Sequence, residues 1–197
     1  MYEASYYRNA GSRNIQCLIC PHNCRIRENH RGICGVRKNI DSKLYLEVYG
    51  QPVALHAEPV EKKPLYHFHP GKDILSLGTP GCNLRCFYCQ NYRISQIKGK
   101  AASTSRYYPP EEILEIAHST GNNIGIAYTY NEPGIFFEYM RDIALPASSM
   151  NMKNAMVSNG FINTAVLDEI IRFTDAFNID LKSIRDDFYV KHTGSFI

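Results

Sequence analysis

The chain has 197 residues, 44% of them hydrophobic, which is enough for a folded domain with its own core. Lys and Arg number 22 against 19 Asp and Glu, and no apolar run approaches the roughly 18 residues of a membrane helix. These figures exclude a disordered chain and a membrane-spanning one, and the balanced charge gives no sign of a nucleic-acid-binding patch. We expect a cytoplasmic protein.

The seven cysteines are the most informative part of the composition, because a reducing cytoplasm keeps thiols free and an odd number cannot pair completely in disulfides. They lie among Gly, Pro, Asn and Arg residues, whereas buried structural cysteines would be scattered through apolar segments. We therefore interpret them as metal ligands. They form an N-terminal set of four and a central set of three: Cys17, Cys20, Cys24 and Cys34, then Cys82, Cys86 and Cys89.

Residues 1–70 are predicted to be a small Cys-rich, metal-binding extension. Residues 43–50 alternate apolar and polar side chains as a half-buried strand does, and the apolar run at 52–57 is a candidate to pair with it. A Pro-containing connector that ends in Pro70-Gly71 follows. We place the domain boundary there.

Residues 71–197 alternate strand and helix patterns, which predicts an α/β fold with a parallel sheet. Pro146 is expected to end the second helix, and Asn163 or Thr164 to cap the third. The predicted strands cover residues 73–79, 124–130, 154–159 and 176–181, and the predicted helices cover 109–121, 134–145, 164–173 and 186–193.

Polar residues follow each of these four strands, in the sequences GTPGC, TYNEP, SNG and DLKS. The carboxyl ends of parallel strands lie at the same edge of a sheet, where α/β proteins place their sites. The four segments are therefore predicted to line one pocket.

The central cysteines follow the first of these strands in the sequence CNLRCFYC. Three thiolates on one loop can hold three corners of a 4Fe-4S cluster and leave the fourth iron open, as catalytic metal sites do. Zinc would need a fourth ligand from elsewhere, such as His67 or His69. The spacing favours the iron-sulfur cluster.

CNLRCFYC resembles the CxxxCxΦC motif of the radical S-adenosylmethionine superfamily, with Tyr88 as the aromatic residue. The resemblance implies a partial (β/α) barrel in which a 4Fe-4S cluster reductively cleaves S-adenosylmethionine. The products are methionine and a 5'-deoxyadenosyl radical, which abstracts a hydrogen atom from a substrate.

The segment Tyr130-Asn131-Glu132-Pro133 resembles the GGEP motif of that family, which holds the amino group of S-adenosylmethionine. Asn131 and Glu132 are thereby implied as cofactor-binding residues, although Tyr130 and Asn131 replace both glycines. Glu132 could alternatively be an acidic residue at the start of the following helix.

Two further segments resemble cofactor-binding turns of the family. Ser158 and Asn159 resemble its TNG-type turn near the methionyl and ribose groups, and Asp180 and Lys182 resemble the DLK motif of glycyl-radical-enzyme activases. The first pair is also compatible with an ordinary Asn-Gly turn, and the second with a surface salt bridge.

Residues 17 to about 140 resemble most closely the AmmeMemoRadiSam-system branch, whose relatives include pyruvate formate-lyase activating enzyme. Glu58 and Gly134 depart from the pattern of that branch. The resemblance implies an activase-like enzyme with an electron donor such as flavodoxin or ferredoxin, and with a partner protein or a small molecule as substrate. A non-catalytic iron-sulfur or zinc-binding electron-transfer module is the alternative.

The N-terminal four cysteines have the number of thiolates that closes a tetrahedral site, so zinc and a second iron-sulfur cluster both fit. Residues 71–197 number 127. That length holds about four βα units of about 30 residues, against about six in the implied barrel. We therefore expect a C-terminally truncated form of a longer enzyme.

Overall fold

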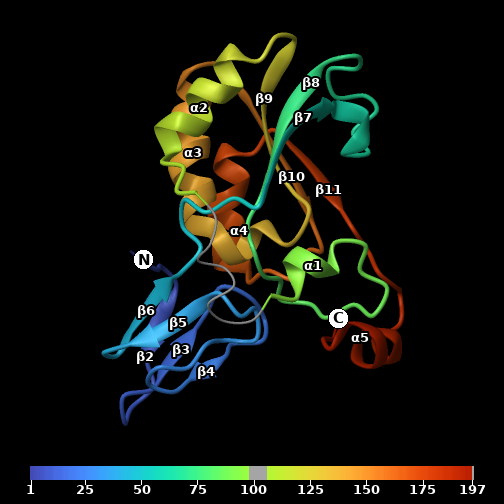
Figure 1. Ribbon diagram of the computed structural model, residues 1–197. Coiled ribbons are helices and arrows are strands. Elements are labelled where there is room, and N and C mark those ends of the chain that lie inside the picture. Colours follow the sequence, from blue (N-terminus) through green and yellow to red (C-terminus); the bar gives the residue numbers. More distant parts are fainter. Residues whose placement is uncertain (98–105, 197) are drawn as a thin grey trace.

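The computed structural model describes residues 1–97 and 106–196 (Figure 1). The N-terminal part consists of short strands: β1 (Tyr2–Glu3), β2 (Tyr7–Asn9), β3 (Ile15–Cys17), β4 (Arg25–Ile26), β5 (Arg37–Ile40) and β6 (Lys43–Leu46). They form two small antiparallel sheets with the strand orders β1-β6-β5 and β2-β3-β4.

A five-stranded sheet with the order β11-β10-β9-β8-β7 forms the rest of the framework. Strands β8 to β11 are parallel, and β7 runs antiparallel to β8 at one edge. The strands are β7 (Ala54–Pro59), β8 (Asp73–Gly78), β9 (Asn123–Tyr128), β10 (Lys153–Ser158) and β11 (Ala176–Ile179). The predicted α/β class and parallel strands are confirmed.

Helices α2, α3 and α4 cover one face of this sheet (Figure 1). Within the part of the chain that the structure describes, no helix is long and apolar enough to span a membrane. The helices are α1 (Tyr92–Ser95), α2 (Pro110–Ser119), α3 (Phe137–Ser149), α4 (Thr164–Ile170) and α5 (Asp186–Thr193), with short 3-10 helices η1 (Val60–Lys62), η3 (Pro133–Phe136) and η4 (Ile171–Phe173).

Three local expectations need correction. The run at 52–57 contributes to β7 and pairs with β8, because both edges of β6 are already occupied by β1 and β5. Helix α3 continues past Pro146 to Ser149, since its last turn buries Ala147 completely. Asn163 occupies the N-cap position of α4, but its side chain donates to the Leu18 carbonyl oxygen at 2.8 Å and makes no cap hydrogen bond.

The two faces of the sheet differ in side-chain size because residues alternate along each strand. Large residues such as Leu75 and Tyr128 face the helices in the main core. The opposite face carries small residues such as Ala127 and Ala155, packed with residues of the segment between β7 and β8. This inner face therefore has room for polar groups next to the carboxyl ends of the strands.

A buried ion pair joins the N-terminal sheets to the helical layer. Arg37 on β5 donates to Glu138 on α3 at 2.5 Å, and both side chains are fully buried. Arg37 also donates to the Ile135 carbonyl oxygen at 2.8 Å, and Glu138 accepts from the Ser5 amide at 2.7 Å. Each charge thus has several polar partners, which buried charges require.

We predict that Arg37→Met lowers the free energy of unfolding by about 3–5 kcal/mol, because it leaves the Glu138 carboxylate buried without its cation. Urea unfolding of the full chain measures this change. The double variant Arg37→Met/Glu138→Met should lose less than the single variant. Lys43→Met breaks the exposed pair with Glu3 and is the matched control, with no measurable change expected. A small loss in Arg37→Met would contradict the prediction.

Candidate functional site

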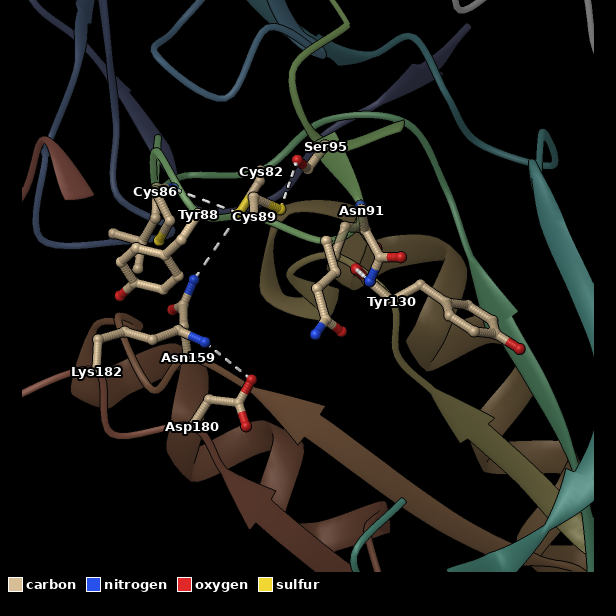
Figure 2. A pocket seen from close by; sticks show the side chains of 13 residues that line it. Cys82, Cys86, Tyr88, Cys89, Asn91, Ser95, Tyr130, Asn159, Asp180 and Lys182 are labelled. Atoms are coloured by element: carbon tan, nitrogen blue, oxygen red, sulfur yellow. Dashed lines mark hydrogen bonds and ion pairs between the residues drawn. The ribbon is translucent and has the colours of Figure 1, made fainter. Parts of the chain in front are cut away.

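A pocket of about 310 Å³ lies at the carboxyl ends of β8, β9, β10 and β11, where the sequence predicts it (Figure 2). All four segments that follow these strands contribute side chains. The lining residues are Cys82, Leu84, Cys86, Tyr88, Cys89, Gln90, Asn91, Ser95, Tyr130, Asn131, Asn159, Asp180 and Lys182.

The three central thiols lie on one side of this pocket. They are close enough that charges on Cys86 and Cys89 raise the pKa of Cys82, although its burial is the larger cause. Burial also raises the pKa of Cys86. Cys89 Sγ lies 3.2 Å from Ser95 Oγ. Cys82 and Cys86 are therefore favoured as neutral thiols until a positive centre stabilises their thiolates.

Contacts with two other parts of the chain hold the loop that carries these cysteines. Gly81 has φ +95°, and a Cβ on it would lie 2.7 Å from the Cys34 carbonyl oxygen, so only glycine fits there. On the other side, the Arg85 amide donates to the Thr193 carbonyl oxygen at the end of α5 at 2.7 Å. The N-terminal part and α5 thus fix the loop from opposite directions.

Glu132 lies behind the pocket wall and is fully buried. Burial raises its pKa to about 7, against the lowering effect of hydrogen bonds from the Gly134 and Asn159 amides. These bonds are 3.0 Å and 2.8 Å long, and Ser158 Oγ donates to the same carboxylate at 3.0 Å. The carboxylate is thus oriented by neutral donors, which leaves a positively charged ligand as a favourable addition.

Asn131 and Asn159 connect this region to the cysteine loop. The Asn131 side chain donates to the carbonyl oxygens of Thr79 and Gly81, each at 2.6 Å, while its own Oδ1 is buried without a hydrogen-bond partner among the described residues. Asn159 Nδ2 donates to Asn83 Oδ1 at 2.9 Å and lies 3.9 Å from Cys82 Sγ. The unpaired Asn131 oxygen is available to accept a hydrogen bond from a ligand.

Asp180 and Lys182 also line the pocket, with Lys182 beside Tyr88 (Figure 2). Lys182 Nζ donates to Asp180 Oδ2 at 3.0 Å, so the salt bridge that the sequence allows does form. The Lys182 charge also lowers the pKa of Cys86, which places the ammonium group near the thiols. Asp180 and Lys182 therefore form a salt bridge and also line the pocket.

Most of the residues that the sequence predicts for the site line one pocket, while Glu132 and Ser158 lie behind its wall. Sequence reasoning assigned no role to Tyr130, Asn91 or Ser95, which also line it. Asn91 and Ser95 follow the third cysteine closely, so proximity to that cysteine was the available signal. For Tyr130, the sequence offers no signal beyond its replacement of a glycine of the motif.

The four N-terminal cysteines also come together. Burial raises the pKa of Cys17 to about 11 and that of Cys20 to about 12, with smaller contributions from the charges of Cys24 and Cys34. The buried Arg37 guanidinium lowers the pKa of Cys17. Within residues 1–97 and 106–196, no group of three or more His, Cys, Asp or Glu side chains is arranged so that it could hold a metal ion.

The raised pKa of Glu132 gives a prediction for stability against pH. An unfolded carboxyl group near its ordinary value of 4.5 loses its proton before the folded group at about 7. The folded state therefore loses stability as the pH rises from 4.5 to 7. Relative to Glu132→Gln, the cofactor-free protein should lose up to about 3 kcal/mol over this interval in urea unfolding. A difference that stays constant from pH 5 to pH 8 would contradict it.

Comparison with known proteins identifies the family of the chain. The Radical SAM superfamily profile matches residues 76–196. An uncharacterized protein of Methanocaldococcus jannaschii is 42% identical over 191 residues, which cover 97% of this chain and 56% of that protein. Pyruvate formate-lyase 1-activating enzyme of Escherichia coli is 24% identical over 116 residues, 58% of this chain and 47% of the enzyme. The chain thus spans about half the length of these relatives, and it belongs to the radical SAM superfamily.

Proposed function

We propose that the chain binds a 4Fe-4S cluster through Cys82, Cys86 and Cys89 and cleaves S-adenosylmethionine reductively in the adjoining pocket. The observation that carries this proposal is the set of three thiols on one wall of a pocket whose other walls hold polar groups suited to an amino acid. When bound, the reduced cluster supplies the electron that splits S-adenosylmethionine into methionine and a 5'-deoxyadenosyl radical, which takes hydrogen from the substrate.

The residues of the pocket fit the proposed ligands chemically. Three thiols satisfy three irons and leave one for the amino and carboxylate groups of S-adenosylmethionine. In the part of the chain that the structure describes, the buried Glu132 carboxylate has no cation among its hydrogen-bond partners, and Asn131 Oδ1 has no donor. An ammonium group would supply both the cation for Glu132 and the hydrogen-bond donor for Asn131 Oδ1. We therefore assign Asn131 and Glu132 to the amino group.

The remaining pocket residues are assigned by their charge and position. Lys182 offers an ammonium group near Cys86, which suits the carboxylate of S-adenosylmethionine, and Asp180 holds that lysine in place. Ser158 orients Glu132, while Asn159 reaches toward Cys82 and the ribose side of the pocket. Tyr88 covers the edge of the cysteine loop beside Cys86.

The partners and the wider architecture belong to the same proposal. The relative from Escherichia coli is named for activating another enzyme, which supports a protein as the substrate of this chain. We also propose a flavodoxin or ferredoxin as its electron donor, as the resemblance implies. We further propose the AmmeMemoRadiSam-system branch, a partial barrel in which about four of about six βα units are present, and a Cys-rich extension over residues 1–70. These assignments rest on the resemblance and on the sheet described above.

The N-terminal cysteines are proposed to hold a second metal, either zinc or an iron-sulfur cluster. Four thiols gather in a segment whose strands have two to four residues each, too short for much stability of their own. A bound metal would supply that stability. Cys24 is partly exposed, which leaves a route for the metal to enter.

The main test is reaction of the anaerobically reconstituted protein with dithionite and S-adenosylmethionine. We expect release of 5'-deoxyadenosine, and its loss in Cys86→Ala, because two thiolates do not hold the cluster with one open iron. Cys24→Ala is the matched control, since it removes a cysteine of the other set. Absence of a cluster on the central thiols in the wild-type protein would reject the proposal and favour a non-catalytic metal-binding module.

The second metal is tested by measuring iron, sulfide and zinc per chain after anaerobic purification. Cys24→Ser should lower only the metal of the N-terminal set, and Cys86→Ser only the iron of the central set. Zinc lost from Cys24→Ser assigns a structural zinc, and iron with sulfide lost assigns a second cluster. Equal metal content in Cys24→Ser and wild-type protein would contradict a second site.

A further inference from the structure

A polar cluster on the inner face of the sheet has no part in the proposed chemistry. Glu58 at the end of β7 accepts hydrogen bonds from Lys63 Nζ at 2.6 Å and from the Tyr130 hydroxyl at 2.8 Å. Lys63 Nζ also lies 4.8 Å from the centre of the Tyr130 ring. The Lys63 side chain is only 4% exposed, so its charge depends on Glu58 for compensation.

The Tyr130 backbone adopts an unusual conformation. Its φ is +71°, a left-handed value that favours glycine and costs a non-glycine residue on the order of 1 kcal/mol or more. Neighbouring Gly78 makes space for it, because a Cβ on Gly78 would lie 3.1 Å from both Cβ and Cδ2 of Tyr130. Such a conformation persists only where surrounding contacts hold it, and the bond to Glu58 is one of them.

The turn formed by Tyr130 and Asn131 contacts both ends of the cysteine loop. Asn91, two residues after Cys89, donates to the Tyr130 carbonyl oxygen at 2.7 Å. Asn131 donates to the carbonyl oxygen of Gly81, immediately before Cys82, at 2.6 Å. A displacement of this turn therefore moves the beginning and the end of the loop together.

The side chain and the backbone of Tyr130 thus point to different partners. Figure 2 shows its ring extending away from the three cysteines, while its backbone lies beside Asn91. The hydrogen bonds from Lys63 and Tyr130 lower the pKa of Glu58 to about 2, against the raising effect of burial. The carboxylate therefore stays charged at neutral pH and remains a strong acceptor for the phenol.

We propose that Tyr130 is a positioning residue, tethered to the Glu58–Lys63 pair so that its turn fixes both ends of the cysteine loop and the adjoining ligand pocket. The inference rests on the proposed function only where it predicts an effect on the affinity for S-adenosylmethionine. The tether itself is a property of the protein alone. It can therefore be measured with or without the cofactor.

The test compares Tyr130→Phe, Tyr130→Gly and the wild-type full chain by amide hydrogen exchange without cofactor. Tyr130→Phe removes only the hydroxyl, and Tyr130→Gly removes the tether while relieving the left-handed backbone. In both variants we expect exchange over residues 79–91 to rise roughly tenfold, as expected for losing a hydrogen bond to a charged group. Exchange in β5 and β6 should not change. Tyr66→Phe, at a tyrosine that is 63% exposed, is the matched control.

The second measurement is the dissociation constant of S-adenosylmethionine for the reconstituted proteins at equal iron content. We expect it to rise roughly tenfold in both variants. Wild-type exchange and affinity in Tyr130→Gly would overturn the inference, because the backbone conformation would then suffice. Increased exchange throughout the chain would also overturn it, since Tyr130 would then serve general stability. A wild-type protein that binds no S-adenosylmethionine would reject the proposed function, and the exchange data would still decide the inference.

Discussion

The buried pair of Arg37 and Glu138 is the interaction on which the arrangement of this molecule depends. It joins a strand of the N-terminal sheets to the helix that follows Glu132, and the same guanidinium holds the Ile135 carbonyl oxygen. Two charges with no exposure are costly unless each keeps its partners. The N-terminal part therefore has one favourable position against the sheet, and the backbone next to Glu132 is fixed by the same contact.

Buried polar groups also fix the pocket. They lie behind its walls and hold the side chains that line it in position. Ser158 and the Asn159 amide orient Glu132, while Asn131 anchors the start of the cysteine loop. Burial of a carboxylate without a cation lowers stability at neutral pH, and such a cost is typical of sites prepared for a ligand. A ligand with an ammonium group would recover part of that cost. Stability and binding are thus linked at Glu132.

The sequence was sufficient for the strands and helices of the parallel sheet, because their apolar periodicity is strong, and for the gathering of polar segments at one edge. It was insufficient where a contact between residues far apart in the sequence determines the local structure. β7 joins the large sheet because β6 has no free edge, and α3 passes Pro146 because burial of Ala147 outweighs one lost hydrogen bond. The position of Tyr130 depends on Glu58, which lies 72 residues away along the chain, so no local pattern could reveal it.

The contacts between the two cysteine sets have a consequence for how the chain can be divided. Gly81 lies against the Cys34 carbonyl oxygen so closely that no side chain fits between them, and Arg85 donates to the Ile33 carbonyl oxygen at 2.7 Å. His22 Nε2 lies 2.9 Å from the Asn83 carbonyl oxygen on the same loop. The segment that carries the N-terminal cysteines thus packs directly against the central cysteine loop. Residues 1–70 therefore cannot be removed without exposing backbone of the central loop, because that backbone packs directly against residues of the first set.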